Sequence, residues 1–199
     1  GKSTLAKCIN AINLPESGAV YVNGMDTLDE NNLLPIREKV GMVFQNPDNQ
    51  IVATIVEEDV AFALENMGVE PNEIRRRVDE ALKTVGMYEY RLHAPHKLSG
   101  GQKQLISFAR TLLSDPKILV LDEATSSIDA RTEKLLQQGL QRLLVGRTSF
   151  IIAHRLSTIK NCDKIMYIDN KGIAECGTHD QLIAKKGEYY KLYTAQHMD

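Results

Sequence analysis

The sequence has 199 residues, a length that fits one domain or one domain carrying an inserted subdomain. Apolar residues make up 43% and charged residues 25%, a usual globular mix that excludes disordered, collagen-like and coiled-coil chains. Lysine plus arginine number 24 and aspartate plus glutamate 26. The chain therefore lacks the excess of basic residues that would indicate nucleic-acid binding. The longest apolar run, 60–64, is far short of the roughly 20 residues that a membrane span needs.

In chain order, short apolar runs that predict strands alternate with stretches of helical periodicity. The turn dipeptide Asn23-Gly24 predicts a hairpin near the start. Strands this short and rich in Ile and Val are typical of a largely parallel sheet that is buried on both faces. The predicted strands are 19–22, 40–44, 118–121, 149–153 and 164–168, with an edge strand at 173–176.

Three apolar stripes at helical spacing predict amphipathic helices. More than seventy residues separate Phe44 from Ile118 and contain no convincing strand, which is too long for an ordinary crossover. We therefore predict an α/β fold with an inserted helical subdomain. The stripes are Val56, Val60, Ala63, Leu64 and Met67; Ile74, Val78, Ala81, Leu82 and Val85; and Leu136, Leu140, Leu143 and Leu144.

The first four residues, Gly1-Lys2-Ser3-Thr4, have the composition of the end of a phosphate-binding loop that leads into a helix. That chemistry needs free helix N–H groups, a lysine for the β/γ-phosphate oxygens and a hydroxyl for Mg²⁺. Four residues alone are weak evidence, and a frayed polar terminus is the favoured interpretation when they are taken by themselves.

The run 118–121 leads into two adjacent carboxylates, Asp122 and Glu123. A buried strand would deliver both acids to the carboxyl edge of the sheet, where ligands bind in open α/β sheets. There Asp122 would help hold Mg²⁺ and Glu123 would polarise an attacking water. A strand that runs out into a solvated acidic turn is the alternative.

Ser99-Gly100-Gly101-Gln102 opens another predicted helix. Ser99 and Gln102 form an S-x-x-Q capping box. The two glycines favour an anion site in addition, because consecutive glycines are costly unless the backbone must approach a ligand closely. Gln45, Asp129 and His154 indicate no site when each is taken singly.

Together these residues resemble the ATP-binding cassette ATPases in order and spacing over the whole chain. The resemblance implies a P-loop NTPase (RecA-like) fold, an ATPase activity coupled to transport, and the cofactors ATP and Mg²⁺. The matching motifs are 1–4 (Walker A), 44–47 (Q-loop), 98–102 (signature), 121–123 (Walker B), 127–129 (D-loop) and 153–155 (H-loop).

The resemblance assigns a role to each matching position. Lys2, Ser3 and Thr4 would contact the phosphates, with Ser3 and Gln45 at Mg²⁺. Glu123 would be the general base and His154 the contact to the γ-phosphate. Gly1 and Gln102 belong to the same nucleotide-binding motifs.

The resemblance also implies partners. The family works as a head-to-tail dimer, so Ser99, Gly100 and Gly101 would grip ATP held by a second ATPase subunit, homo- or heterodimeric, and Asp129 would lie at that interface. A transmembrane transporter subunit would dock near the Q-loop, placing the protein peripherally on the cytoplasmic face of the membrane. No nucleic-acid partner is expected; Arg75–Arg77 lie off the apolar stripe and predict a solvated face.

The two halves resemble different branches of the family. Residues 4–102 look like energy-coupling-factor importer ATPases, and the sequence from Gln104 onward looks like multidrug-type exporters. We infer a join between the two parts near 102–105. We expect three units: a truncated N-terminal core part (1–45), a helical subdomain with the signature (46–115) and a C-terminal core part (116–199).

The family motif begins before Gly1, so we expect the N-terminal strands to be missing from this chain. The 199-residue chain by itself is then expected to bind Mg-ATP very weakly and not to turn it over. Two alternatives stay open: a non-catalytic fragment of such an ATPase, and a soluble ATPase of the same family.

Overall fold

The computed structural model describes residues 1–44, 46–122, 130–153, 156–169 and 172–196. Its centre is a three-stranded parallel sheet in the order β3-β4-β5, formed by Val40–Val43, Ile118–Asp122 and Thr148–Ile152. Val40 pairs with Ile118 and Ile118 with Thr148, so the three strands begin level with one another. The middle strand β4 is buried along nearly its whole length, as its unbroken apolar run predicts.

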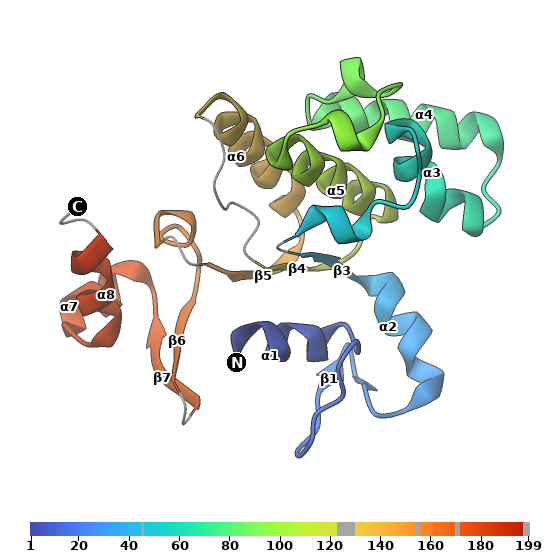
Figure 1. Ribbon diagram of the computed structural model, residues 1–199. Coiled ribbons are helices and arrows are strands. Elements are labelled where there is room, and N and C mark those ends of the chain that lie inside the picture. Colours follow the sequence, from blue (N-terminus) through green and yellow to red (C-terminus); the bar gives the residue numbers. More distant parts are fainter. Residues whose placement is uncertain (45, 123–129, 154–155, 170–171, 197–199) are drawn as a thin grey trace.

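One face of this sheet is covered by helices α3 (Val56–Asn66), α4 (Pro71–Thr84), α5 (Gly100–Ser114) and α6 (Ala130–Leu144) (Figure 1). Their apolar stripes and the upper side of the sheet share one core, in which Leu82, Leu105 and Phe108 are fully buried. The short 3₁₀ helix η2 (Pro47–Gln50) lies between β3 and α3, and η3 (Tyr88–Tyr90) and η4 (Pro95–Lys97) lie between α4 and α5.

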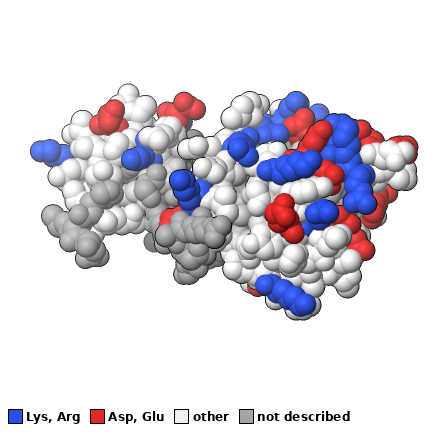
Figure 2. All heavy atoms as spheres, turned by 90° about the horizontal axis from the view of Figure 1, so that it is seen from above, with Lys and Arg blue, Asp and Glu red and all other residues white. Residues whose placement is uncertain are grey.

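Helix α5 is the centre of the helical layer. It packs against α3, α4 and α6, and also against η2 and β3. Seen from above, basic and acidic side chains are interleaved over this layer (Figure 2).

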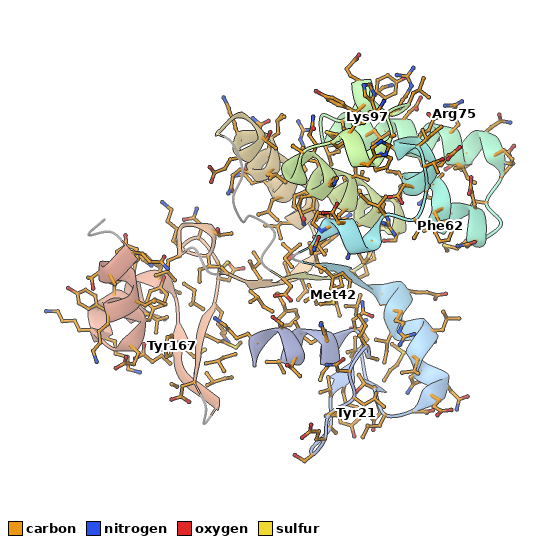
Figure 3. The ribbon with its side chains drawn as sticks, in the orientation of Figure 1. Tyr21, Met42, Phe62, Arg75, Lys97 and Tyr167 are labelled. Carbon is orange, nitrogen blue, oxygen red and sulfur yellow. The ribbon has the colours of Figure 1, made fainter. Side chains whose placement is uncertain are left out.

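The opposite face of the sheet carries α1 (Lys2–Ile9), the hairpin β1–β2 (Tyr21–Val22 and Met25–Asp26), η1 (Glu30–Asn32) and α2 (Leu33–Lys39) (Figure 1). A second core lies here, with Ile36, Val40 and Val120 among its buried members. Met42 points from the sheet toward this side (Figure 3).

The C-terminal residues form an antiparallel pair, β6 (Ile165–Asp169) and β7 (Gly172–Gly177), followed by α7 (His179–Lys185) and α8 (Glu188–Gln196). A third core, which includes Leu156 of η5 (Leu156–Thr158), holds this unit together. The Glu175 carboxylate on β7 accepts the backbone N–H groups of Glu188 and Tyr189, at 2.7 and 3.1 Å, at the start of α8.

The structure confirms the α/β class and corrects the grouping of the strands. Only three of the predicted strands share the parallel sheet, whereas β1–β2 and β6–β7 are separate antiparallel pairs. The reason is connection length: two residues can join antiparallel neighbours, but parallel neighbours need a crossover of about a dozen residues or more. The hairpin at Asn23-Gly24 is confirmed.

The predicted apolar stripe of α3 is partly wrong, because Ala63 and Met67 are exposed while Val56, Val60 and Leu64 are buried. Met67 lies one residue beyond the last helical position, where the helical spacing no longer applies.

The three arginines of α4 form structural contacts. Arg75 pairs with Glu57 at 3.1 Å, and Arg77 donates to the carbonyl of Leu113 at 2.7 Å. Arg76 pairs with Glu73 at 2.6 Å, and its guanidinium lowers the pKa of that carboxyl. Exposed pairs of this kind contribute little stability. Figure 3 shows Arg75 on the outer side of the helical layer.

Candidate nucleotide-binding site

Helix α1 begins directly after Gly1 and packs against β4 and β5. Lys2, Ser3 and Thr4 are exposed in its first turn, where backbone N–H groups have no partner within the helix. The first turn of α1 therefore offers lysine, hydroxyl and amide donors together at one edge of the sheet, a combination suited to phosphate.

A hydrogen bond joins the first predicted motif to the second. Ser3 Oγ donates to Asp122 Oδ1 at 3.0 Å, although the two residues are 119 positions apart in the chain. Asp122 ends β4 and is buried, with 8% of its surface exposed, while Ser3 faces solvent. A hydroxyl and a carboxylate oxygen held in contact are hard oxygen ligands of the kind that Mg²⁺ takes in proteins. These residues fit a Mg²⁺–phosphate ligand.

Strand β3, which precedes position 45 in the chain, packs closely against Pro116 and Thr111. A Cβ atom on Gly41 would lie 2.6 Å from Cγ of Pro116 and 3.0 Å from Cγ2 of Thr111. Glycine is therefore required where β3 passes the turn that precedes β4.

The predicted capping box at the start of α5 is confirmed. Gln102 Oε1 accepts the Ser99 N–H at 2.9 Å, and Ser99 Oγ accepts the Gln102 N–H at 3.2 Å. Ser99 and Gly100 are exposed, so the start of this helix is open to an anion. Among the described residues, no hydrogen bond or ion pair links this end of α5 to Ser3 or Asp122. The two predicted phosphate-binding regions are thus not joined by hydrogen bonds among these residues.

Four predicted site residues, Gln45, Glu123, Asp129 and His154, lie outside the described residues. The expectations for them stay predictions.

The structure adds one residue that the sequence analysis missed. Asp59 lies on the buried side of α3, between Val56 and Val60, and none of its side-chain surface is exposed. Its carboxylate accepts the backbone N–H groups of Val52 and Ala53, at 2.8 and 3.3 Å. The available signal was a carboxylate at i+3 in an apolar stripe, a position where a charge needs a partner.

Residues 1–126 match the family model described as ABC transporter. The energy-coupling factor transporter ATP-binding protein EcfA1 of Clostridium novyi (strain NT) is 50% identical over 186 residues, covering 92% of this chain and 66% of that protein. EcfA1 of Clostridium perfringens (strain 13 / Type A) is 53% identical over 171 residues, covering 85% and 61%. The chain therefore spans two thirds or less of the length of these relatives.

Solved structures show the same fold. The structure of cbiO1 from Clostridium perfringens, part of the ABC transporter complex cbiONQ, has a TM-score of 0.80 at 33% identity, covering 96% of this chain and 78% of that one. A bacterial Atm1-family ABC exporter with ATP bound has a TM-score of 0.81 at 31% identity, covering 98% and 35%. A dimeric ATP-binding cassette in a post-hydrolysis state, bound to ADP and Pi, has a TM-score of 0.79 at 30% identity, covering 90% and 81%.

Proposed function

The chain belongs to the ABC transporter family, and on that premise we propose that the protein binds ATP and Mg²⁺ where α1 meets β4. It hydrolyses the nucleotide to drive solute transport across a membrane. The observation that carries the proposal is the Ser3–Asp122 hydrogen bond, because it joins two motifs 119 positions apart in the chain at the carboxyl edge of the sheet.

Each residue at this edge has a chemical task. The first-turn N–H groups of α1, with Lys2, Ser3 and Thr4, bind the phosphates. Ser3 and Asp122 hold Mg²⁺ with Gln45, and Glu123 takes the proton of the attacking water while His154 contacts the γ-phosphate. Mg²⁺, when bound with ATP, neutralises the negative charge that builds up on the phosphates.

We propose a second ATPase subunit as a partner. The start of α5 carries Ser99, Gly100, Gly101 and Gln102; Ser99 and Gly100 are exposed and Gly101 is buried. In the part of the chain that the structure describes, no hydrogen bond joins this end to Ser3 or Asp122, so a nucleotide held by a second subunit could reach Ser99 and Gly100. The dimeric neighbour bound to ADP and Pi supports this arrangement. Asp129 belongs to the same proposed interface.

The other proposed partner is a transmembrane transporter subunit, on the cytoplasmic face of the membrane. Within the described ranges, no helix has both the length and the apolar character needed to cross a bilayer. Segment 46–70 exposes Val52, Phe62 and Met67, at 60, 44 and 68% of their surface, and Figure 3 shows Phe62 on the outer side of α3. Replacing this segment by its exporter equivalent is expected to abolish binding to an energy-coupling-factor membrane subunit. Unchanged binding would contradict an importer-like docking surface.

The proposed units are 1–45, 46–115 and 116–199. The helical unit would carry α3, α4 and α5, and the flanking units would carry the phosphate-binding edge.

Hydrolysis of ATP is the direct test, on the protein expressed from its complete reading frame. We expect Mg²⁺-dependent release of phosphate, and a loss of about 10- to 100-fold in either Ser3→Ala or Asp122→Asn, the range known for groups that orient a metal. Because the two side chains act together, the double variant is expected to lose little more than either single one. The control is Ser114→Ala, which removes only a hydroxyl bonded to the carbonyl of Thr111. No hydrolysis by the wild type, or full activity in both variants, would overturn the proposal.

A further inference from the structure

Three side chains on one face of α5 hold the segment 47–53, which starts two residues after Gln45. Lys103 Nζ lies 2.6 Å from Asp48 Oδ1, and Ser107 Oγ donates to Gln50 Oε1 at 2.9 Å. Arg110 donates from Nη1 to the backbone carbonyl of Gln50. Positions 103, 107 and 110 are one helical turn apart and share a face, so they form a ladder along the segment.

Asp59 closes this arrangement from the neighbouring helix α3. One carboxylate oxygen accepts the N–H groups of Val52 and Ala53, and the other lies 3.4 Å from Arg110 Nη1. The Asp59 side chain is fully buried, whereas 28% of the Arg110 side chain is exposed. A single carboxylate thus fixes both the backbone of the segment and the arginine that binds it.

A buried ion pair is not required for stability, because a well-packed apolar pair of similar volume often serves as well or better. The ion pair and its hydrogen bonds differ from apolar packing because they require a particular geometry. These bonds fix where the backbone of 47–53 lies relative to α5, which apolar packing does not. Figure 1 shows η2 next to α5, on the side of α5 that is turned toward the sheet.

We propose that Asp59 is a positioning residue: with Arg110 it locks segment 47–53 to α5, so that this segment, which follows Gln45 in the chain, moves together with the Ser99–Gln102 end of the helix. Lys103, which pairs with Asp48, lies one turn from Ser99, so a displacement of segment 47–53 reaches the start of the helix through polar contacts. The inference rests on the proposed function for the roles of Gln45 and Ser99, but the lock itself does not.

The test uses Asp59→Asn, which keeps shape and one acceptor oxygen but loses the charge, and Arg110→Lys, which keeps the charge but replaces the planar guanidinium whose Nη1 contacts both Gln50 and Asp59. Both are made in the protein expressed from its complete reading frame. The matched control is Glu175→Gln, because Glu175 is also a buried carboxylate that accepts two backbone N–H groups, in the separate C-terminal unit.

Hydrogen exchange measures the lock directly. We expect exchange at the amides of Val52 and Ala53 to rise at least about tenfold in Asp59→Asn and Arg110→Lys, and not in Glu175→Gln. Unchanged exchange in both Asp59→Asn and Arg110→Lys would overturn the inference, whether or not the protein hydrolyses ATP.

Steady-state kinetics measure the consequence. We expect kcat to fall about tenfold and the Mg²⁺ concentration for half-maximal rate to rise, while KM for ATP changes less than about twofold. If Asp59 were only structural, Asp59→Asn would lower the stability of the protein, as Glu175→Gln is expected to do. The molecules that stay folded would then hydrolyse ATP with an unchanged Mg²⁺ dependence. Raised exchange without any change in kcat or Mg²⁺ dependence would overturn the positioning role. An inactive wild type with raised exchange in the variants would refute the proposed function and leave the lock standing.

Discussion

Replacing Gly41 by alanine is expected to destabilise the protein, because β3 passes Pro116 at a distance that leaves no room for a side chain. The new Cβ would lie 2.6 Å from Cγ of Pro116, whereas non-bonded carbon atoms are ordinarily about 3.5–4.0 Å apart. The proline ring cannot rotate out of the way. Overpacking costs about 1–3 kcal/mol, and alanine regains about 0.5–1 kcal/mol over glycine in a strand. Because the overlap is with a rigid ring, we expect a cost near the top of the first range and a net loss of about 2 kcal/mol.

Urea unfolding followed by circular dichroism measures this loss, provided that the denaturant dependence m stays the same. A double-mutant cycle isolates its cause, because Pro116→Ala removes the ring atom that the new Cβ would meet. In the Pro116→Ala background the cost of Gly41→Ala is expected to shrink by about 1 kcal/mol. An equal cost in both backgrounds, or a more stable Gly41→Ala protein, would refute the reasoning.

Two further predictions concern the cores. Phe108→Ala is expected to lower the free energy of unfolding by about 3–5 kcal/mol, because Phe108 is fully buried, whereas Phe62→Ala, at a 44% exposed residue, should cost far less; equal losses in urea titrations would contradict this. The N–H groups of Glu188 and Tyr189 lower the pKa of Glu175, so its stabilising contribution is complete above the ordinary value of 4.5 and is lost as the pH falls below it. Glu175→Gln should therefore flatten the acid limb of the stability profile below about pH 4.5, and parallel profiles would show the linkage to be absent.

Local patterns predicted the elements well and their grouping less well. Two predictions depend only on residues that are neighbours in the chain: the strand at 118–121 and the capping box at Ser99. Both are confirmed. Which strands share a sheet depends on chain connections, so β6 and β7 were wrongly added to the parallel sheet. The family resemblance is confirmed, while the join near 102–105 stays a prediction.

The candidate site shows the same division. Ser3 and Asp122 could be predicted because each lies in a recognisable motif, and the structure brings them into contact. Asp59 could not be assigned a partner from sequence, because nothing in the chain indicates that Arg110, on another helix, turns toward it. Contacts between side chains distant in sequence are decided by packing, and periodicity carries no information about them.

The pairing of β3 with β4 has a consequence for the order of folding. It joins Val40 to Ile118, and three helices of the helical layer, α3, α4 and α5, lie in the chain between them. Closing so long a loop costs entropy that only later contacts repay, so parallel pairing of this kind forms slowly. The hairpins and the α3–α4–α5 contacts are local and can form early. The edge of the sheet where Ser3 meets Asp122 is then among the last parts of the molecule to assemble, and partly folded chains have helices before they have a site.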